Sequence, residues 1–435
     1  MRWSRILTMD NIISRYHERS MEEQNRKVKA FDAINVPEFR LYIIMRFFFI
    51  MALRMTATVV GWKIYILTRN PLALGMIGLS EVIPAVSLAL YAGHVIDKSD
   101  KRKMLLKSIS FYLICIIALL IIHLDFTEQH AGKKIVELSI YLVIFCTGII
   151  RAFSGPTTNA LIAQLVPKNI LPNAVTWSSG TWLIASVIGH ATAGFLIAHA
   201  GYTITFSVII GYIIVAIVCV AVIGPKPIVN LNREQRIWES MKEGLRHVFK
   251  TKELLGALSL DLFAVLFGGA VALIPVFAAD ILKVGAEGFG WLNAAADMGA
   301  IASIALLTFY PLQRNQGRIL LYAVAGFGIC IILFGLSKIF WFSFAALMLS
   351  GILDGISVVV RSTILQLKTP DSMRGRVSSV NSMFINSSNE LGQFESGLAA
   401  KLVGVIPAVV LGGSMTLFVV VITWLKAPSL RKLEY

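Results

Sequence analysis

Charged side chains are scarce in this chain of 435 residues. Only 15% of the residues are Asp, Glu, Lys or Arg, whereas 56% are hydrophobic. In a typical soluble domain about 25% of the residues are charged, and they make its surface hydrophilic. The shortage of charge therefore excludes an ordinary soluble domain and is typical of a chain that crosses a membrane many times.

Cysteines are also few, and recognisable catalytic motifs are missing. All four cysteines (Cys115, Cys146, Cys219 and Cys330) lie in apolar stretches, so we expect neither a disulfide framework nor a metal site. The sequence has no Gly-x-x-x-x-Gly-Lys-Ser/Thr loop for ATP, and no zincin, triad or nucleophile-elbow pattern in a sensible context. We therefore expect a protein that is not an enzyme and holds no cofactor.

Residues 1–38 lack the apolar core of a cleavable signal sequence, because they are polar and basic. We interpret them as a cytoplasmic N-terminal segment. Trp3, Ile6, Leu7 and Ile13 fall near one helical face, which is typical of an amphipathic helix at the membrane surface. A loosely ordered tail is the alternative.

Long apolar runs fill the rest of the chain. A bilayer core about 30 Å thick needs roughly 20 residues of helix to cross it. Twelve runs are long enough, and their approximate bounds are 39–68, 71–96, 104–124, 136–166, 172–199, 202–224, 254–280, 288–310, 318–337, 339–367, 377–402 and 404–425. The sequence therefore predicts an all-α polytopic membrane protein with twelve transmembrane helices.

Lys and Arg are distributed unevenly among the loops. With the N-terminus in the cytoplasm, alternate loops hold most of them, whereas the opposite loops hold only Arg69, Lys133, Lys134, Lys283 and Lys338. Because cytoplasmic loops carry the excess of Lys and Arg, this pattern predicts that both termini are cytoplasmic. The net charge of +15 then reflects topology, so the lipid bilayer, not nucleic acid, is the expected partner.

The largest polar break in the hydrophobic region lies at 225–253. Trp238, Met241, Leu245 and Val248 recur there at helical spacing, which predicts an amphipathic helix on the cytoplasmic membrane face. The break defines the predicted organisation: a six-helix half at 39–224, the linker at 225–253, a second six-helix half at 254–425 and a cytoplasmic tail at 426–435.

A short basic loop with one characteristic acid lies at 93–103. Its residues Gly93, Asp97, Lys98, Lys101 and Arg102 fit the pattern Gly-x-x-x-Asp-Arg/Lys-x-Gly-Arg/Lys-Arg/Lys, with an aspartate at position 100 where the pattern has glycine. The loop resembles the signature between the second and third spans of the major facilitator superfamily. The resemblance implies a latch between the two halves on the cytoplasmic side; a simple topogenic loop is the alternative.

Four further stretches resemble the drug–proton antiporter branch of that superfamily, which includes enterobactin and macrolide exporters. They lie at 151–156, 261–269, 373–377 and 386–397. The resemblance implies a proton-coupled exporter, usually a monomer, in the inner membrane of a bacterium. It places Arg151 in a proton relay or in packing near the latch.

The fifth span departs from that branch. The antiporter motif there has Gly-Pro, whereas this chain has Gly189 followed by His190. The histidine either weakens the gate that the proline would form or adds a titratable group to it. A hydrogen bond between helices is the simpler role for His190, and a proton relay is the other.

Arg54 lies near the middle of the first span. An ionisable group there costs at least about 2.5–3.5 kcal/mol on insertion scales, so it needs a reason to be present. In one interpretation, Arg54 faces the transport path and binds either an anionic substrate or a protonatable carboxylate. In the other, it forms a structural ion pair with Glu81.

Proton antiport needs a group that binds a proton or the substrate in turn, and a buried carboxylate meets this need. The intramembrane candidates are Glu81, Asp261, Asp297, Asp354, Glu390 and Glu395, of which we prefer Asp261, then Glu390, then Glu81. Asn386 and its polar neighbours make the eleventh span suited to contact with water or substrate. Asp354 and Arg361 share a helical face, which predicts an ion pair.

Together these patterns predict a secondary-active exporter that moves a small amphipathic compound outward in exchange for protons. An uptake or lipid carrier of the same fold is an alternative within the same class. A membrane receptor or scaffold without transport is an alternative from another class. The intramembrane charges argue against a scaffold, which gains nothing from the cost of burying them.

Overall fold

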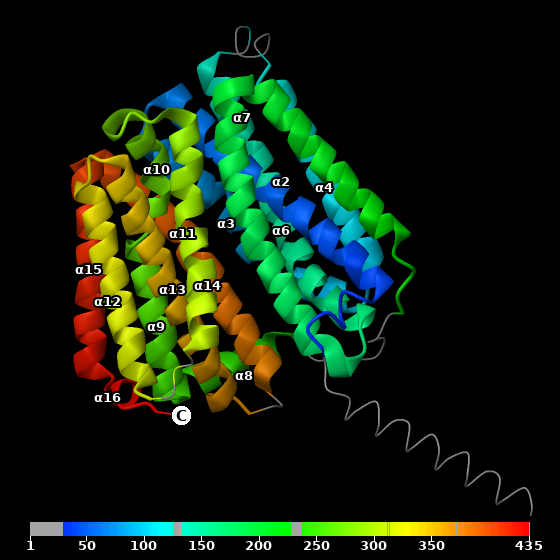
Figure 1. The fold of residues 1–435 in the computed structure, drawn as a ribbon, viewed down its shortest axis with the longest axis vertical. Coiled ribbons are helices and arrows are strands. Elements are labelled where there is room, and N and C mark those ends of the chain that lie inside the picture. The colour runs from blue at the N-terminus through cyan, green and yellow to red at the C-terminus, as the bar shows by residue number, and fades with distance from the viewer. Residues whose placement is uncertain are drawn as a thin grey trace, which may run out of the picture.

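The protein is described by a computed structural model covering residues 29–124, 130, 132–227, 237–310, 312, 314–370 and 373–434. All of the longer elements are helices (Figure 1): α2 Pro37–Thr68, α3 Pro71–Asp97, α4 Lys101–Ile122, α6 Lys133–Leu165, α7 Leu171–Val222, α8 Ile237–Lys250, α9 Lys252–Phe267, α10 Ile274–Val276, α11 Gly285–Phe309, α12 Gln316–Leu336, α13 Phe340–Lys368, α14 Arg374–Val403, α15 Val405–Lys426 and α16 Pro428–Arg431. The all-α prediction is confirmed. The predicted surface helix around Trp3 and Ile13, and residues 228–236 of the predicted linker, lie outside the described residues.

Ten helical stretches in the described part of the chain are long and apolar enough to cross a membrane. The number differs from the twelve predicted spans at two places. Helix α7 covers two predicted spans and breaks at Gly201, whose φ of 79° interrupts the helical backbone. Helix α14 covers the eleventh, which is 30 residues long but too polar to count by composition. The twelve-span count stays a prediction.

The predicted span at 254–280 is not one continuous helix. Helix α9 ends at Phe267, and two glycines separate it from a short run of 3₁₀, α and π turns that ends at Ile281. A Cβ atom at Gly269 would lie 2.7 Å from the carbonyl oxygen of Gly392 in α14. The break therefore lets the backbone approach the neighbouring helix closely, which a continuous helix with side chains could not do.

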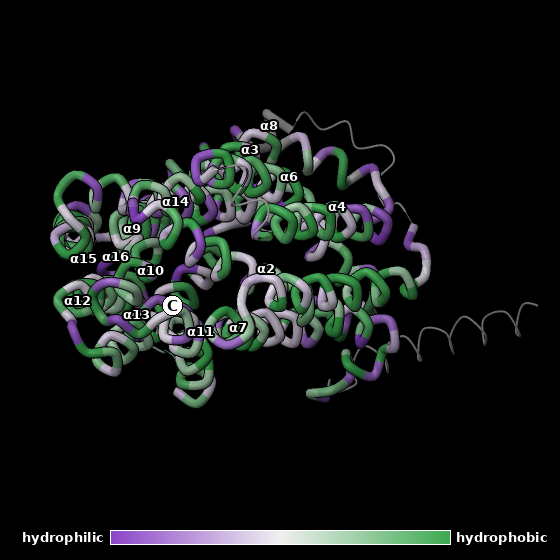
Figure 2. The backbone as a smooth tube through the Cα atoms, turned by 90° about the horizontal axis from the view of Figure 1, so that it is seen from above, coloured by the Kyte–Doolittle hydropathy of each residue, from purple (hydrophilic) through white to green (hydrophobic). Residues whose placement is uncertain are grey.

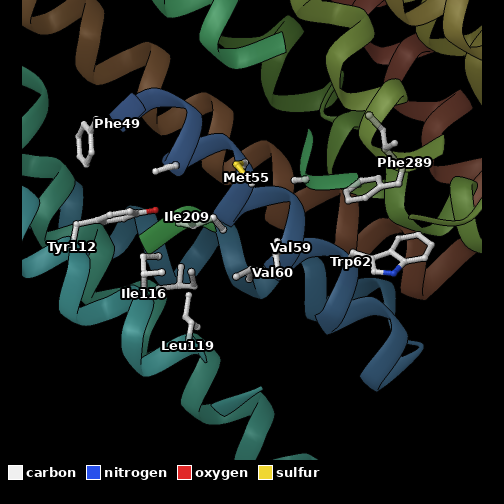
Figure 3. Close-up of a cluster of buried hydrophobic side chains, with 14 of the residues drawn as sticks. Phe49, Met55, Val59, Val60, Trp62, Tyr112, Ile116, Leu119, Ile209 and Phe289 are labelled. Carbon is white, nitrogen blue, oxygen red and sulfur yellow. The ribbon is translucent and has the colours of Figure 1, made fainter. Parts of the chain in front are cut away.

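The helices form two bundles (Figures 1 and 2). Helices α2, α3, α4, α6 and α7 make the first bundle, and α9 to α15 make the second. The first is filled by apolar side chains between α2, α4 and α7, among them Phe49, Tyr112 and Ile209 (Figure 3). Large apolar side chains such as Phe111 and Leu142 stay exposed, which suits helices that face lipid.

The two bundles meet along two helix pairs, α7 with α11 and α3 with α14, and diverge toward the end where α8 lies (Figure 1). Glycines lie at both contacts. A Cβ atom at Gly194 would lie 2.7 Å from the Cα of Gly290, and one at Gly397 would lie 2.9 Å from the Cα of Gly75. Without side chains at these positions, the helix backbones can touch, as is common between membrane helices.

Polar contacts join the two bundles at the end opposite α8, which we call the closed end. Arg69, just after α2, forms a 2.8 Å salt bridge with Asp280, and the Tyr65 hydroxyl donates to the same carboxylate. His199 in α7 lies 3.9 Å from Glu287 in α11. Both contacts join the first bundle to the second, so this end is held by charge as well as by helix packing.

Helix α8 occupies part of the predicted linker and packs against the second bundle. Its Val248 is buried with Leu254 of α9 and Val377 of α14, and its Glu243 pairs with Arg376. The linker is thus attached to one bundle at the end where the bundles diverge.

Replacing Gly194 by isoleucine should separate the bundles at the closed end. Overpacking costs about 1–3 kcal/mol, which shifts an equilibrium by roughly 5–150-fold. We expect a fall of this order in cross-linking of the Arg69→Cys/Asp280→Cys pair, measured in membranes without the native cysteines. Gly211→Ile is the matched control, because Gly211 lies in the second segment of α7, after the break at Gly201, and a Cβ there meets nothing within 4 Å. Equal yields in both variants would show that this contact does not hold the end closed.

Candidate functional site

Five ionisable side chains lie at mid-helix between the bundles. They are Arg54 in α2, Glu81 in α3, Arg151 in α6, Asp297 in α11 and Glu390 in α14. Each is at least ten residues from both ends of its helix, or about 15 Å at 1.5 Å per residue. These side chains form two clusters, one on each side of the region where the bundles meet.

The first cluster joins three helices through one guanidinium. Arg151 Nη1 lies 2.8 Å from Glu81 Oε1 in its own bundle and 2.6 Å from Glu390 Oε1 in the other. Gln393 donates to the second oxygen of Glu390 at 3.0 Å. A Cβ at Gly78 would lie 2.8 Å from the carbonyl oxygen of Glu390, so a glycine is what lets α3 and α14 come this close. We call Arg151, Glu81 and Glu390 the clasp.

The charges of the clasp do not balance. With both carboxylates ionised it carries one excess negative charge, and one proton makes it neutral. Glu390 has only 8% of its side chain exposed, whereas Arg151 has 44% exposed. An accessible guanidinium at this depth is much less costly beside water than beside lipid. The clasp thus combines a buried carboxylate with a partly exposed guanidinium.

The second cluster lies at the α7–α11 contact and includes Arg54. The Arg54 guanidinium lies 4.7 Å from the ring centroid of Trp182, a cation–π distance. In the described part of the chain Arg54 has no carboxylate within salt-bridge distance, and Glu81, the predicted partner, pairs with Arg151. His190 Nε2 lies 3.8 Å from Asp297 Oδ2, and Ser186 donates to the same oxygen.

A third buried pair lies inside the second bundle. Asp261 in α9 pairs with Arg361 in α13, and both side chains are less than 10% exposed. The predicted partner of Arg361 was Asp354, seven residues earlier in the same helix. That separation is about 10 Å along the axis, whereas Asp261 comes from an adjacent helix. The pair joins two helices of one bundle and does not reach the other.

The loop residues of the predicted latch make contacts within the first bundle. Lys101 donates to the carbonyl oxygens of Ile96 and Ser99, and Arg102 donates to that of Val220 in α7 at 3.1 Å. A Cβ at Gly93 would meet nothing within 4 Å, and the side chain of Asp97 lies outside the described residues.

Asp100, the departure from the signature, has a local role. Its side chain accepts from the backbone N–H of Lys103 at 3.2 Å and so caps the N-terminus of α4. An N-cap aspartate satisfies a helix donor that glycine would leave to water. The departure is therefore explained by the start of the helix.

The eleventh predicted span, α14, carries the polar residues Asn386 and Glu390, which were expected to contact water or substrate. Asn386 is exposed one turn from Glu390, which is buried. Sequence reasoning missed Ser186, Trp182 and Thr58 as site residues, because a lone Ser, Trp or Thr in an apolar span carries no spacing signal. Asp297 was one carboxylate among several, with nothing to favour it.

Comparison with known proteins agrees with the fold. Residues 30–434 match the transmembrane secretion effector family. The enterobactin exporter EntS of Escherichia coli O127:H6 is 26% identical over 352 residues, which cover 79% of this chain and 80% of EntS. EntS of Shigella boydii serotype 4 is 25% identical over the same shares.

Solved transporters have the same fold at low identity. A D-xylose–proton symporter superposes with a TM-score of 0.71 at 12% identity, over 93% of this chain and all of its own. The nucleoside transporter NupG gives 0.69 at 12% identity, over 89% of this chain and 99% of its own. This chain therefore belongs to the transmembrane secretion effector family of the major facilitator superfamily, a family of multi-pass membrane transporters and not of enzymes.

Proposed function

We propose that this protein is a secondary-active exporter of a small amphipathic compound, drug-like or siderophore-like, driven by proton antiport with alternating access. The observation that carries the proposal is the clasp, in which Arg151 binds Glu81 in one bundle and Glu390 in the other. The similarity to enterobactin exporters supports the direction and the substrate class. The proposal includes twelve spans, a monomer and the inner membrane of a bacterium.

The charge pattern supports an orientation. The basic linker that includes α8 and the 93–103 loop lie at the diverging end, and Lys- and Arg-rich loops belong in the cytoplasm. Both termini are then cytoplasmic, and the closed end with Arg69 and Asp280 faces outward. We therefore infer an inward-facing state that substrate would enter from the cytoplasm.

The clasp couples proton and substrate through competition. A hydrogen-bond donor or cationic group of the substrate binds the excess negative charge at Glu390, and a proton binds there in its absence. Either event weakens the bond between Arg151 and Glu390, which is a bond between the bundles. Freed from it, the bundles can rock around the midplane and expose the site to the other side.

Other predicted residues line the same path. Arg54 on Trp182 offers a flat cationic surface for an aromatic or anionic part of the substrate. Asn386, one turn from Glu390, offers a hydrogen bond. We keep Asp97, Lys101 and Arg102 as the cytoplasmic latch of the outward-facing state, in which the diverging ends would close.

The contacts favour Glu390 over Asp261 as the proton carrier. Asp261 is neutralised by Arg361 inside one bundle, so its protonation breaks no bond between the bundles. Protonation of Glu390 does break one. Only a group at the contact between the bundles can convert proton binding directly into a change in their angle.

Replacing Glu390 by glutamine should abolish proton coupling. In proteoliposomes with an imposed pH gradient, addition of a transported compound should collapse the gradient with wild-type protein. With Glu390→Gln, proton movement should fall to that of empty vesicles. The panel holds catecholate siderophores, macrolides and amphipathic dyes. Glu395→Gln is the matched control, because Glu395 lies in the same helix outside the clasp.

The same assay separates the alternatives. Accumulation of the compound on the cytoplasmic side would indicate uptake. Absence of any movement in folded wild-type protein, across the whole panel, would favour a scaffold. Full coupling in Glu390→Gln would exclude Glu390 as the carrier.

Replacing Asp261 by asparagine should destabilise the fold. The change leaves Arg361 buried without its partner, and breaking a buried pair in this way costs about 3–5 kcal/mol. The double variant Asp261→Leu/Arg361→Met should recover most of that loss, as measured by thermal unfolding in detergent. A stable double variant that still exchanges protons would assign the pair to structure. A stable double variant without exchange would restore Asp261 as the carrier.

A further inference from the structure

His190 and Asp297 meet across the two bundles at a point that the clasp does not reach. His190 comes from α7 and is 8% exposed, and Asp297 comes from α11. Their nearest atoms, Nε2 and Oδ2, are 3.8 Å apart, which is within ion-pair range but too long for a hydrogen bond. Gly194, one turn after His190, and Gly290, two turns before Asp297, touch between the same two helices.

The hydrogen bonds around His190 fix its tautomer. Thr58 Oγ1 lies 3.0 Å from the carbonyl oxygen of Arg54 and 2.7 Å from His190 Nδ1. A carbonyl oxygen only accepts, so the single hydroxyl proton of Thr58 goes to Arg54. Both contacts are then satisfied only if His190 Nδ1 donates to Thr58. Nδ1 therefore carries a hydrogen, and Nε2 is the nitrogen left to gain or lose one.

Nε2 faces a carboxylate oxygen. When the pair carries no extra proton, the lone pair of Nε2 and the negative Oδ2 repel each other across the contact between α7 and α11. One proton, on Nε2 or on the Asp297 carboxyl, turns this repulsion into attraction. Ser186 already donates to Oδ2 and holds the carboxylate in place. His190 and Asp297 can thus share one proton across the contact between the two bundles.

On the same two helices, His199 of α7 and Glu287 of α11 lie 3.9 Å apart at the closed end. From α2, Arg54 acts on both His190 and Asp297. From α13, on the other side of α11, Asp354 and Arg361 interact with each other and with Asp261. Helix α4, which also packs against α7, has its Lys and Arg residues near its cytoplasmic end, at positions 101, 102, 103 and 107. Arg54 is thus the charged group that tunes the pair.

We propose that His190 and Asp297 form a second proton-binding site, and that a proton bound there holds α7 against α11 and closes the outward end. This rests on the proposed antiport function and deepens it. A proton that enters from outside would bind the open pair, close that end and expose the site to the cytoplasm. The clasp would then exchange substrate for a proton, and the His190 pair would set which way the protein faces.

The experiment measures the closed end directly, without transport. Spin labels are placed at Ile204 and Ile339, exposed residues near this end of the two bundles, in a variant without native cysteines. Distance distributions are recorded in lipid between about pH 5 and pH 8, where histidine titrates. In otherwise wild-type protein, the ratio of short to long distances should rise as pH falls, by at most about tenfold per pH unit for one proton.

Two variants and two controls decide the outcome. Asp297→Asn imitates a neutral carboxyl whose amide can donate to Nε2, so it should give short distances at every pH. His190→Gln, combined with Glu390→Gln so that the clasp no longer titrates, should lose the pH response. His199→Gln, which removes the other imidazole between α7 and α11, should keep it. Glu390→Gln should also keep it even where proton-coupled transport is lost, so failure of the clasp and failure of this pair are told apart.

Several results would overturn the proposal. A pH response that survives both the His190→Gln/Glu390→Gln combination and Asp297→Asn would place the proton elsewhere. So would wild-type protein whose distances do not change with pH. Misfolding can be recognised separately, because Asp297→Asn is expected to keep the short-distance population at every pH, which a misfolded protein would lose.

Discussion

The arrangement of this transporter depends on one constraint, the cost of holding ionised groups at the middle of a membrane. Arg151 meets that cost by binding two carboxylates at once, one from each bundle. A guanidinium suits this role because its planar fork stays charged and donates in several directions. Removing Arg151 would leave two carboxylates without a cation in a poor solvent, whereas removing one carboxylate would leave a neutral pair, so the guanidinium is the member on which the other two depend. Under the proposed function, the contact between the bundles would therefore depend on the charge state of the clasp.

Glycine backbones make that conditional contact possible. Side chains at Gly75, Gly78 and Gly194 would prevent the helices of the two bundles from touching, and the carboxylates would then lie out of reach of their partners. Apolar burial gives little preference between helix–helix and helix–lipid contact in a membrane, so close packing and polar bonds have to hold the bundles together. Both helix pairs use the same solution. The consequence is that polar chemistry at either pair can change the angle between the bundles.

The sequence predicts the fold class well because the bilayer imposes simple rules on length and charge. The polar residues of α14 can also be read directly from the sequence, because they interrupt an otherwise apolar span. The sequence fails on partners: Arg361 pairs with Asp261, which is 100 residues away, and not with Asp354, which the helical spacing suggested. The sequence also could not show that the partner of Glu81 is Arg151 and not Arg54. Spacing along one helix indicates a shared face, but the partner across a contact is set by how the helices pack.

His190 shows how a departure from a family pattern acquires meaning only in three dimensions. Proline at this position would remove a backbone donor and bend the helix, whereas α7 stays helical through His190 until Gly201. A buried imidazole needs partners, and Thr58 and Asp297 supply them from α2 and α11. In the proposed mechanism, the histidine exchanges a bend in the helix for a contact whose strength depends on a proton. The clasp at one helix pair and the His190 contact at the other would then communicate through the shared angle of the bundles.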